Sequence, residues 1–434
     1  MAHEGNVAEA AVRPSGAGTP GPAASGRLSR RLVRVAARAG SGYAGPSEGG
    51  GSLRITEPGR RDLVVGTGSP EVGVTVVDPR AFAAVAFHGS TGLGRSYVDG
   101  WWESDDLVGV VQVLVRRTAG YRRRLDRLGG RAAGALSLLG RLRPPSKEED
   151  RANIRAHYDL SNELFDLMLD PTMAYSSAVF EHPGQSLERA QVAKFDRLCR
   201  KLALGPSDHV VEIGTGWGGF AVHAAAGYGC RVTTTTISEA QRERAVKRVA
   251  DAGLVDRVTV LDADYRDLTG TYDALVSVEM VEAVDWRRHD EFFAVCDRLL
   301  RPDGRMALQA ITMADGSYER AKHHDDFIRS MIFPGGCIPS VAAIAGSVAR
   351  ATELRIVDLE DIGRHYAETL ARWRANVEEH REEIGALGFD DRFLRLWTFY
   401  LAYCEAAFLE RHISDVQVVL ARPGWRPPLA TRPC

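Results

Sequence analysis

Alternating blocks of apolar and polar positions divide the second half of the chain into helices and strands. Ser186 can cap a helix over residues 187–203, and 239–252 has a second helical pattern. The short apolar runs between such stretches are typical of strands. Strands are expected at 209–213, 231–237, 257–261, 273–278 and 305–311. This alternation predicts an α/β fold, a parallel sheet with helices on both faces.

Two later apolar runs extend the sheet. Residues 355–362 and 415–424 have strand patterns, and they flank a helical section over about 366–410. A strand that returns to a sheet through a helical section can enter it in the opposite direction. We therefore expect the last strand to be antiparallel.

The first 150 residues follow a different pattern. Residues 1–52 are rich in Gly, Ala, Pro and Ser and are predicted to be disordered or a linker. Residues 53–145 contain the β-like segments LVVG and VGVTVV, then a helical stretch over 107–143 that ends at two prolines. We expect a small α+β module here, for lipid docking or dimerisation. The main domain is expected at 150–424, with a tail at 425–434.

Composition and charge narrow the class of protein. The chain has 434 residues, 44% of them hydrophobic, and a net charge of −2, so a large core is expected and polyelectrolyte binding by the whole protein is not. Residues 116–143, however, contain nine arginines and one acidic residue. Such a segment suits lipid headgroups or nucleic acid, and a solvated helix face is an equal alternative. GWW at 100–102 adds aromatic side chains suited to a membrane interface.

The cysteines and the apolar runs bear on location. None of the six cysteines forms a CxxC pair, which argues against a zinc site or a disulfide framework and fits a reducing cytoplasm. No signal peptide is visible, and no apolar run approaches 18 residues. We expect no metal and a cytoplasmic protein that contacts the inner face of the membrane peripherally.

The sequence VVEIGTGWGGF at 210–220 is the first chemical signal. A glycine loop after an apolar strand usually holds a nucleotide. This loop lacks the Lys-Ser/Thr ending of a P-loop, and its GxGxG spacing differs from GxGxxG. Trp217 could supply a wall for S-adenosylmethionine, and Asp264 could accept a hydrogen bond from its adenine amine. These features favour S-adenosylmethionine over NAD.

Six segments together resemble the cyclopropane-fatty-acyl-phospholipid synthase family and its mycolic acid cyclopropane synthase relatives. The resemblance covers about 150–424, and GLGRSYVDGWWESDDL also looks like the N-terminal module of the longer, phospholipid-acting members. The segments are HYDLSNELFDLMLDPTMAYSSAVF (157–180), VVEIGTGWGGF (210–220), SVEMVEAV (277–284), IFPGGCIPS (332–340), HYAETLARW (365–373) and YLAYCEAAF (400–408).

The resemblance implies a fold, a reaction and a set of site residues. The fold is a Rossmann-like class I methyltransferase fold with a seven-stranded sheet, and the reaction transfers a methylene unit from S-adenosylmethionine to a cis double bond in an acyl chain. The implied catalytic residues are Ser177, Glu282, Gln309, Ile311, Tyr366 and Cys404. The implied cofactor-binding residues are Tyr175, Ser176, Glu212, Gly214, Thr215, Gly216, Trp217, Gly218, Thr236, Ile237, Ser238, Gln241, Asp264, Tyr265 and Arg266.

Three positions depart from the better-known members. Those members have cysteine, Glu-His and histidine where this chain has Ser177, Glu282-Ala283 and Gln309. In them, these groups, an isoleucine and a tyrosine hold a bicarbonate that serves as base, so bicarbonate binding is left open here. The variants also resemble a subgroup with plant-type cyclopropane synthases and actinobacterial methyltransferases that make 10-methylene fatty acids.

We expect the chain to form cyclopropane fatty acids on unsaturated phospholipids at the membrane surface, through a carbocation. The alternative is a 10-methylene or methyl-branched product from the same cofactor and lipid. A nucleic-acid methyltransferase is disfavoured because no Pro-Cys or Asn-Pro-Pro-Tyr motif follows the fourth strand. A non-catalytic lipid-binding homologue is disfavoured because Glu282, Tyr366 and Cys404 are retained. A homodimer is possible on this reading.

Overall fold

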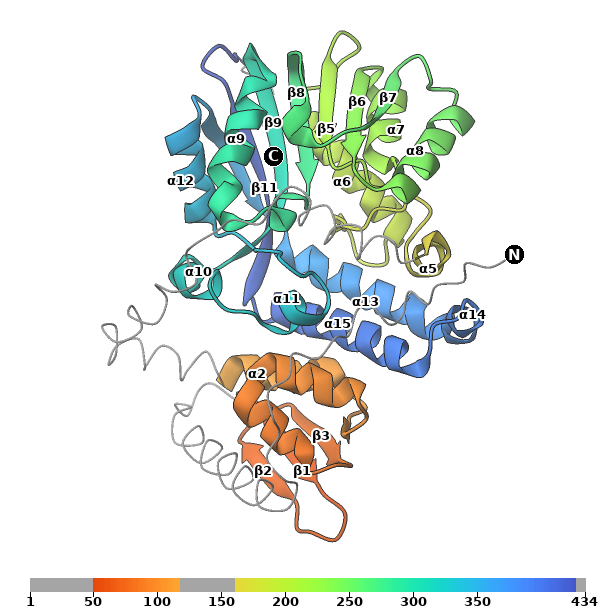
Figure 1. Ribbon diagram of the computed structural model, residues 1–434, viewed down its shortest axis with the longest axis vertical. Helices are drawn as coiled ribbons and strands as arrows, with labels where there is room; N and C mark the ends of the chain where they lie inside the picture. The colour runs from red at the N-terminus through yellow and green to blue at the C-terminus, as the bar shows by residue number, and fades with distance from the viewer. Residues whose placement is uncertain (1–49, 118–160, 427–434) are drawn as a thin grey trace.

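A computed structural model describes residues 50–117 and 161–426. Figure 1 shows two units, a large α/β unit and a smaller unit at the bottom of the view, with the long helices α13 (Gly363–Glu379) and α15 (Asp391–Leu409) between them.

The large unit is built on a seven-stranded sheet with the order β10-β11-β9-β8-β5-β6-β7. Every pair is parallel except those of β11, which is antiparallel to both β9 and β10. The predicted fold is therefore confirmed, and the last strand lies inside the sheet, not at its edge. The strands are β5 (His209–Ile213), β6 (Arg231–Thr236), β7 (Val258–Asp262), β8 (Tyr272–Val278), β9 (Leu300–Met313), β10 (Arg355–Asp361) and β11 (Ile413–Ala421).

Helices cover both faces of the sheet because successive strand side chains point to opposite faces. In β5, Val210 packs in an apolar cluster with α6–α8, and Val211 packs in another with α9 and α12. The predicted helix caps are present, since Ser186 accepts from Arg189 N at the start of α6. These helices are α6 (Leu187–Lys201), α7 (Gly219–Tyr228), α8 (Glu239–Asp251), α9 (His289–Arg298) and α12 (Val341–Ala351).

A third layer crosses the carboxyl ends of the strands. Helices α13 and α15 pack against each other there, and an aromatic-rich core joins them to the small unit (Figure 1). Short elements connect the longer helices and strands. They are α5 (Asn162–Met168), α10 (Asp315–Ala321), α11 (Phe327–Met331), α14 (Arg381–Ala386) and the 3₁₀ turns η3 (Tyr265–Asp267), η4 (Val281–Ala283) and η5 (Trp286–Arg288).

The small unit has a four-stranded sheet with the order β2-β1-β3-β4 and one long helix, α2 (Arg80–Val98), which is broken at Gly89. It docks on α15, where Tyr97 stacks on Phe399 with ring centroids 5.4 Å apart and Arg395 donates to the Tyr97 carbonyl at 2.6 and 2.8 Å. Both β-like segments are confirmed as strands. The strands are β1 (Ser52–Thr56), β2 (Leu63–Gly66), β3 (Glu71–Val76) and β4 (Trp102–Glu103).

The surface features proposed for membrane contact are only partly described. Residues 107–117 are helical, and the rest of the arginine-rich stretch lies outside the described residues. Arg116 pairs with Glu410 at 2.7 Å, so this arginine belongs to the contact with α15. The prediction that Trp102 is an interfacial aromatic was wrong. Its side chain is 2% exposed, and its indole N–H donates to Ser96 in the core.

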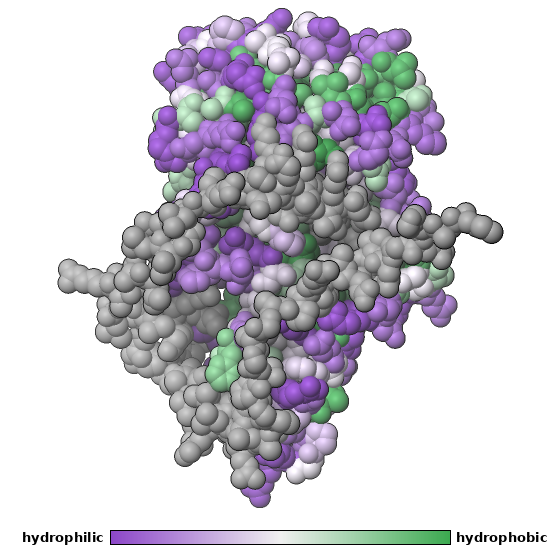
Figure 2. Space-filling model, in the orientation of Figure 1, coloured by the Kyte–Doolittle hydropathy of each residue, from purple (hydrophilic) through white to green (hydrophobic). Residues whose placement is uncertain are grey.

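The described helices include none that is long and apolar enough to cross a bilayer. Where described residues are visible in Figure 2, hydrophilic side chains cover most of the large unit.

Candidate active site

A cavity opens at the carboxyl ends of β5, β6 and β8, and the glycine loop forms one wall of it. Gly214 has φ +99°, a value that an L side chain rarely adopts, and its N–H donates to the Thr235 carbonyl at 3.1 Å. Gly216 also has positive φ, and nothing lies within 4 Å of where its Cβ would be. The loop therefore presents bare backbone to the cavity, which is the close approach that a cofactor needs.

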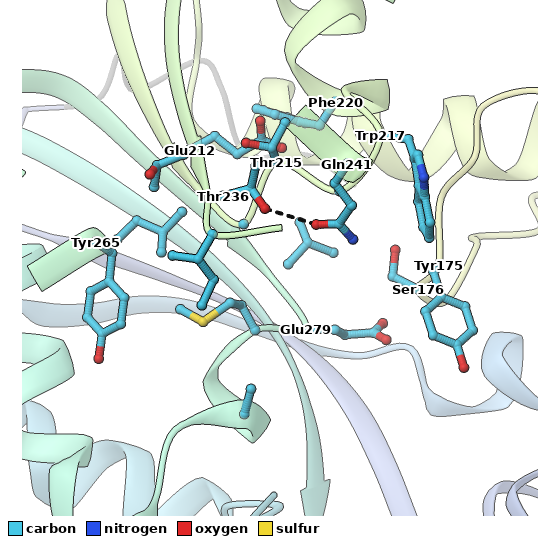
Figure 3. Close-up of a pocket in the computed structure, with 18 of the residues that line it drawn as sticks. Tyr175, Ser176, Glu212, Thr215, Trp217, Phe220, Thr236, Gln241, Tyr265 and Glu279 are labelled. Atoms are coloured by element: carbon cyan, nitrogen blue, oxygen red, sulfur yellow. Dashed lines mark hydrogen bonds between the residues drawn. The ribbon is translucent and has the colours of Figure 1, made fainter. Parts of the chain in front are cut away.

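Polar groups at the ends of the next two strands also line the cavity. At the end of β6, Thr236 Oγ1 donates to Gln241 Oε1 at 3.0 Å (Figure 3). After β7, Asp264 accepts from the Arg266 side chain at 2.7 Å and starts the 3₁₀ turn η3. Glu212 lies below the loop, accepts from Thr234 Oγ1 at 2.6 Å, and has a pKa raised to about 8 by burial.

Figure 3 shows that the cavity has two different ends. Tyr265 stands at one end, and Tyr175, Ser176 and Trp217 stand at the other, where the Glu279 carboxylate points toward them. The Tyr175 ring lies 5.2 Å from that of Trp373, and its hydroxyl is 2.8 Å from the Tyr400 hydroxyl. This second end is rich in aromatic faces.

Most of the predicted cofactor-binding residues line this one cavity. Gly218 and Ser238 do not line it. Gly218 directly precedes α7, and its Cα faces Ala245. Ser238 caps α8 by accepting a hydrogen bond from the Gln241 N–H. Both shape the wall from behind. The predicted residues that line the cavity are Tyr175, Ser176, Glu212, Gly214, Thr215, Gly216, Trp217, Thr236, Ile237, Gln241, Asp264, Tyr265 and Arg266.

Sequence reasoning missed Glu279, to which three of the predicted catalytic residues bind. Its Oε1 accepts from the Ser177 N–H and from Gln309 Nε2, both at 2.8 Å. Its Oε2 accepts from the Tyr366 hydroxyl at 2.6 Å. One sequence feature could have revealed Glu279. It lies in SVEMVEAV directly after β8, at the carboxyl end of the strand, where ligands bind in such sheets.

Glu282 and Ile311 form a separate contact beside this group. Glu282 Oε1 accepts from the Ile311 N–H at 2.5 Å, and its other carboxyl oxygen is buried with no hydrogen-bond partner in the structure. Burial and, to a smaller extent, the nearby Glu279 raise the pKa of Glu282 to about 8. Ala283, next to it, lines the cavity.

Two more buried ionisable groups were missed, Lys194 and Asp415. Lys194 Nζ donates to Ser176 Oγ at 2.5 Å, and burial lowers the lysine pKa to about 8. Asp415 on β11 accepts from Gln309 Nε2 at 3.0 Å. Burial and the neighbouring Glu279 hold the pKa of Asp415 well above its usual range. Lys194 lies on the same face of α6 as Leu198, a spacing that could have revealed its burial.

Cys404 is not brought into this group. It lies on α15 against the apolar core, and burial raises its thiol pKa. His365 accepts from the Phe180 N–H at 3.3 Å, and the two rings stack outside the cavity lining. A catalytic role for Cys404 therefore stays a prediction.

The residues present do not fit a bound bicarbonate. Ser177, Gln309 and Tyr366, which would hold it, already donate to the Glu279 carboxylate. A second anion would also lie among the carboxyl groups of Glu279, Glu282 and Asp415, with repulsion that burial strengthens. Among the described residues, no group of three or more His, Cys, Asp or Glu side chains could hold a metal ion.

The buried Glu282 predicts a pH dependence of stability. Its folded pKa of about 8 lies above that of the unfolded chain, so the folded state binds the extra proton. The free energy of unfolding should then fall as pH rises between about 5 and 8, by about 1.4 kcal/mol per pH unit from this group. Glu282→Gln should reduce that slope in urea unfolding. Glu188→Gln, on the exposed side of α6, should leave it unchanged, and an equal slope in all three proteins would contradict the assignment.

Comparison with known proteins identifies the family. Residues 145–418 match the family model for mycolic acid cyclopropane synthetase. The chain is 41% identical to the tuberculostearic acid methyltransferase UfaA1 of Mycobacterium tuberculosis, over 78% of this chain and 80% of that protein. It is 38% identical to the cyclopropane-fatty-acyl-phospholipid synthase of Escherichia coli, over 82% of this chain and 89% of that protein.

Solved structures agree with the sequence relatives. The mycolic acid cyclopropane synthase CmaA1 in complex with SAH and CTAB has a TM-score of 0.59 and 30% identity, and covers 64% of this chain and 99% of that one. The cyclopropane synthase MmaA2 of M. tuberculosis has the same TM-score and 31% identity. The cofactor of this protein is therefore S-adenosylmethionine. The chain belongs to the mycolic acid cyclopropane synthetase family, methyltransferases that act with S-adenosylmethionine on unsaturated lipids.

Proposed function

We propose that this enzyme adds the one-carbon unit of S-adenosylmethionine to the cis double bond of an unsaturated acyl chain carried by a phospholipid. The observation that carries the proposal is the aromatic, carboxylate-containing end of the cofactor cavity. The CmaA1 complex with CTAB, a detergent with a long alkyl tail, supports a chain-shaped substrate.

The residues at that end suit the chemistry of an alkene. An alkene is a weak nucleophile, so it must be held in line with the methyl group. Methyl transfer leaves a carbocation, which water would trap as an alcohol, so the site must be dry. Trp217 is 1% exposed and Tyr366 is 6% exposed. Aromatic faces can each stabilise such a cation by about 0.5–2 kcal/mol.

The phospholipid substrate is supported by the small unit. The alignment with the E. coli phospholipid synthase covers 82% of this chain, which reaches beyond the 145–418 region of the family model into the N-terminal module. Docking of that module on the inner face of a membrane, through the arginines of 118–143, stays a prediction because those residues lie outside the described part of the chain.

Two products are candidates, and they differ in whether a hydride moves before the proton leaves. Loss of a proton from the new methyl group closes a cyclopropane ring, the product expected from the sequence. A 1,2-hydride shift from the methyl-bearing carbon to the cationic carbon, followed by loss of a proton from the methyl group, leaves a methylene group, the precursor of a methyl branch. The 41% identity to a tuberculostearic acid methyltransferase, together with Ser177, Ala283 and Gln309 at the base site, favours the second product, which we propose as the one to test first.

The test is the structure of the product. Purified enzyme would be incubated with S-adenosylmethionine and vesicles of oleoyl-phosphatidylglycerol, with free oleate as a matched control, and the methyl esters examined by proton NMR. Vinylidene protons from the vesicles would support the methylene product, and upfield ring protons would support the cyclopropane. Turnover of free oleate but not of vesicles would exclude the phospholipid substrate.

A further inference from the structure

Glu279 has a backbone conformation that its residue type does not favour. Its φ is +48°, in the left-handed region where glycine is the usual residue, and it follows β8 directly. Non-glycine residues in this region are strained and are concentrated at functional sites. The conformation is fixed by a hydrogen bond from the Glu279 N–H to the Gln309 carbonyl at 2.8 Å. The side chain points into the cavity, as Figure 3 shows.

The carboxylate is held by three donors from three separate segments. These are the Ser177 N–H, Gln309 Nε2 on β9 and the Tyr366 hydroxyl on α13. All three groups are at most 6% exposed, so water cannot easily replace them. Such a cradle fixes both oxygens while the cavity side of the group stays open to a substrate.

We propose that Glu279 is the proton acceptor of this enzyme, a carboxylate built into the chain at the position where a bicarbonate would otherwise be held. The inference rests on the proposed function and adds to it the residue that completes the reaction.

The step balances in atoms and electrons. The alkene π pair forms the bond to the incoming methyl carbon, the S–C pair stays on sulfur, and the acyl chain becomes a cation. A Glu279 oxygen then takes a proton from the methyl group, and the C–H pair closes the ring onto the cationic carbon. If a 1,2-hydride shift first moves the charge to the methyl-bearing carbon, the same pair forms the new double bond. Glu279 ends as a neutral acid and must pass its proton to solvent before the next turnover.

The groups that face Glu279 leave it able to accept that proton. The positive charge of Lys194 on α6 opposes the burial that raises the Glu279 pKa. Tyr366, Ser177 and Gln309 also favour the ionised form, whereas the carboxyl groups of Glu282 and Asp415 share the same buried region. When Asp415 and Glu282 are protonated, a single carboxylate charge remains in this buried region, opposite the ammonium group of Lys194. The three donors place that charge on Glu279.

Two variants separate the role of the charge from that of the backbone. Glu279→Gln keeps the size but cannot take a proton, and kcat should fall at least about 100-fold with S-adenosylmethionine affinity nearly unchanged. Glu279→Gly suits the positive φ and opens the anion position. It should fold at least as well as wild type, lose activity without bicarbonate and regain part of it when bicarbonate is added. Wild-type turnover should not change when bicarbonate is depleted.

A binding measurement gives a readout that needs no turnover. In a ¹³C-bicarbonate NMR titration, Glu279→Gly should bind the ion and wild type should not. Glu405→Gln is the matched control, because Glu405 is a buried carboxylate paired with Arg374 at 2.9 Å and does not line the cavity. That variant should keep kcat.

The outcomes separate this inference from the proposed function. Slower wild-type turnover without bicarbonate, or a Glu279→Gln variant with more than a third of the wild-type kcat, would overturn the role of Glu279. Equal bicarbonate binding by wild type and Glu279→Gly would contradict the proposal that the Glu279 carboxylate occupies the anion position. If the wild-type enzyme turned over no unsaturated lipid, the proposed function would be wrong. The bicarbonate titration would still show whether Glu279 fills the anion position.

Discussion

Tyr366→Phe is expected to lower kcat about 100-fold while the affinity for S-adenosylmethionine stays within a factor of about three. The substitution removes the hydroxyl that donates to Glu279 Oε2 at 2.6 Å and leaves the ring, which stacks on Phe408 at 4.5 Å, in place. Without that donor, Glu279 should hold its proton to a higher pH. The acid limb of the kcat profile should therefore move to higher pH, which a purely structural role would not produce.

The matched control is Tyr228→Phe. The Tyr228 hydroxyl also donates to a carboxylate, that of Asp196, at 2.5 Å. Neither residue lines the cavity. Both variants lose a tyrosine–carboxylate hydrogen bond, so both should lose similar stability, of the order of 1–2 kcal/mol. Only Tyr366→Phe should lose activity and shift the pH profile. If the two variants had equal kcat values, Tyr366 would have no part in the reaction.

Gly214→Ala is expected to weaken S-adenosylmethionine binding about 10- to 100-fold. At φ +99°, an L residue is strained by about 1–3 kcal/mol, and each 1.4 kcal/mol is a factor of ten in affinity. The new Cβ would also lie 3.3 Å from Met280 Cγ, on a residue that lines the same cavity. The loop would have to shift to relieve either problem. Isothermal titration with S-adenosylmethionine measures the change.

Gly227→Ala is the matched control for Gly214→Ala. Gly227 lies in α7 on the exposed surface, its φ is not positive, and nothing lies within 4 Å of its Cβ position. Alanine there should raise stability by about 0.5–1 kcal/mol and leave the dissociation constant unchanged. A Gly214→Ala protein that bound S-adenosylmethionine as tightly as Gly227→Ala would mean that the loop backbone is not part of the cofactor site.

The order of the sheet elements was predictable because each strand carries its own local pattern. The strands at 209–213 and 231–236 were predicted to within one residue. β9 begins earlier than predicted, at Leu300, because Leu300 pairs with Tyr272 before a bulge in the β8–β9 ladder. The place of β11 inside the sheet was not predictable, since strand order depends on contacts between distant segments and not on local periodicity.

The cofactor wall could be predicted because one loop and two strand ends supply most of it. The proposed base site could be predicted only in part, since its groups come from six segments that are distant in sequence. Glu279, Lys194 and Asp415 are charged residues, which usually lie at the surface unless they are paired. Only the folded chain shows that they lie together, and the resemblance directed attention to Glu282, three residues away from the carboxylate that the donors hold.

The position of β11 has a consequence for the biosynthesis of the enzyme. The ribosome makes this strand after every other described element, yet it separates β9 from β10 and supplies Asp415 and Gln417 beneath the cavity. Until it emerges, β9 keeps an open edge and Gln309 lacks two of its partners. The nascent polypeptide can thus form its cofactor wall early but must wait for its final segment to complete the reactive centre. A translation product that stopped before β11 would be inactive and would expose a strand edge prone to aggregation.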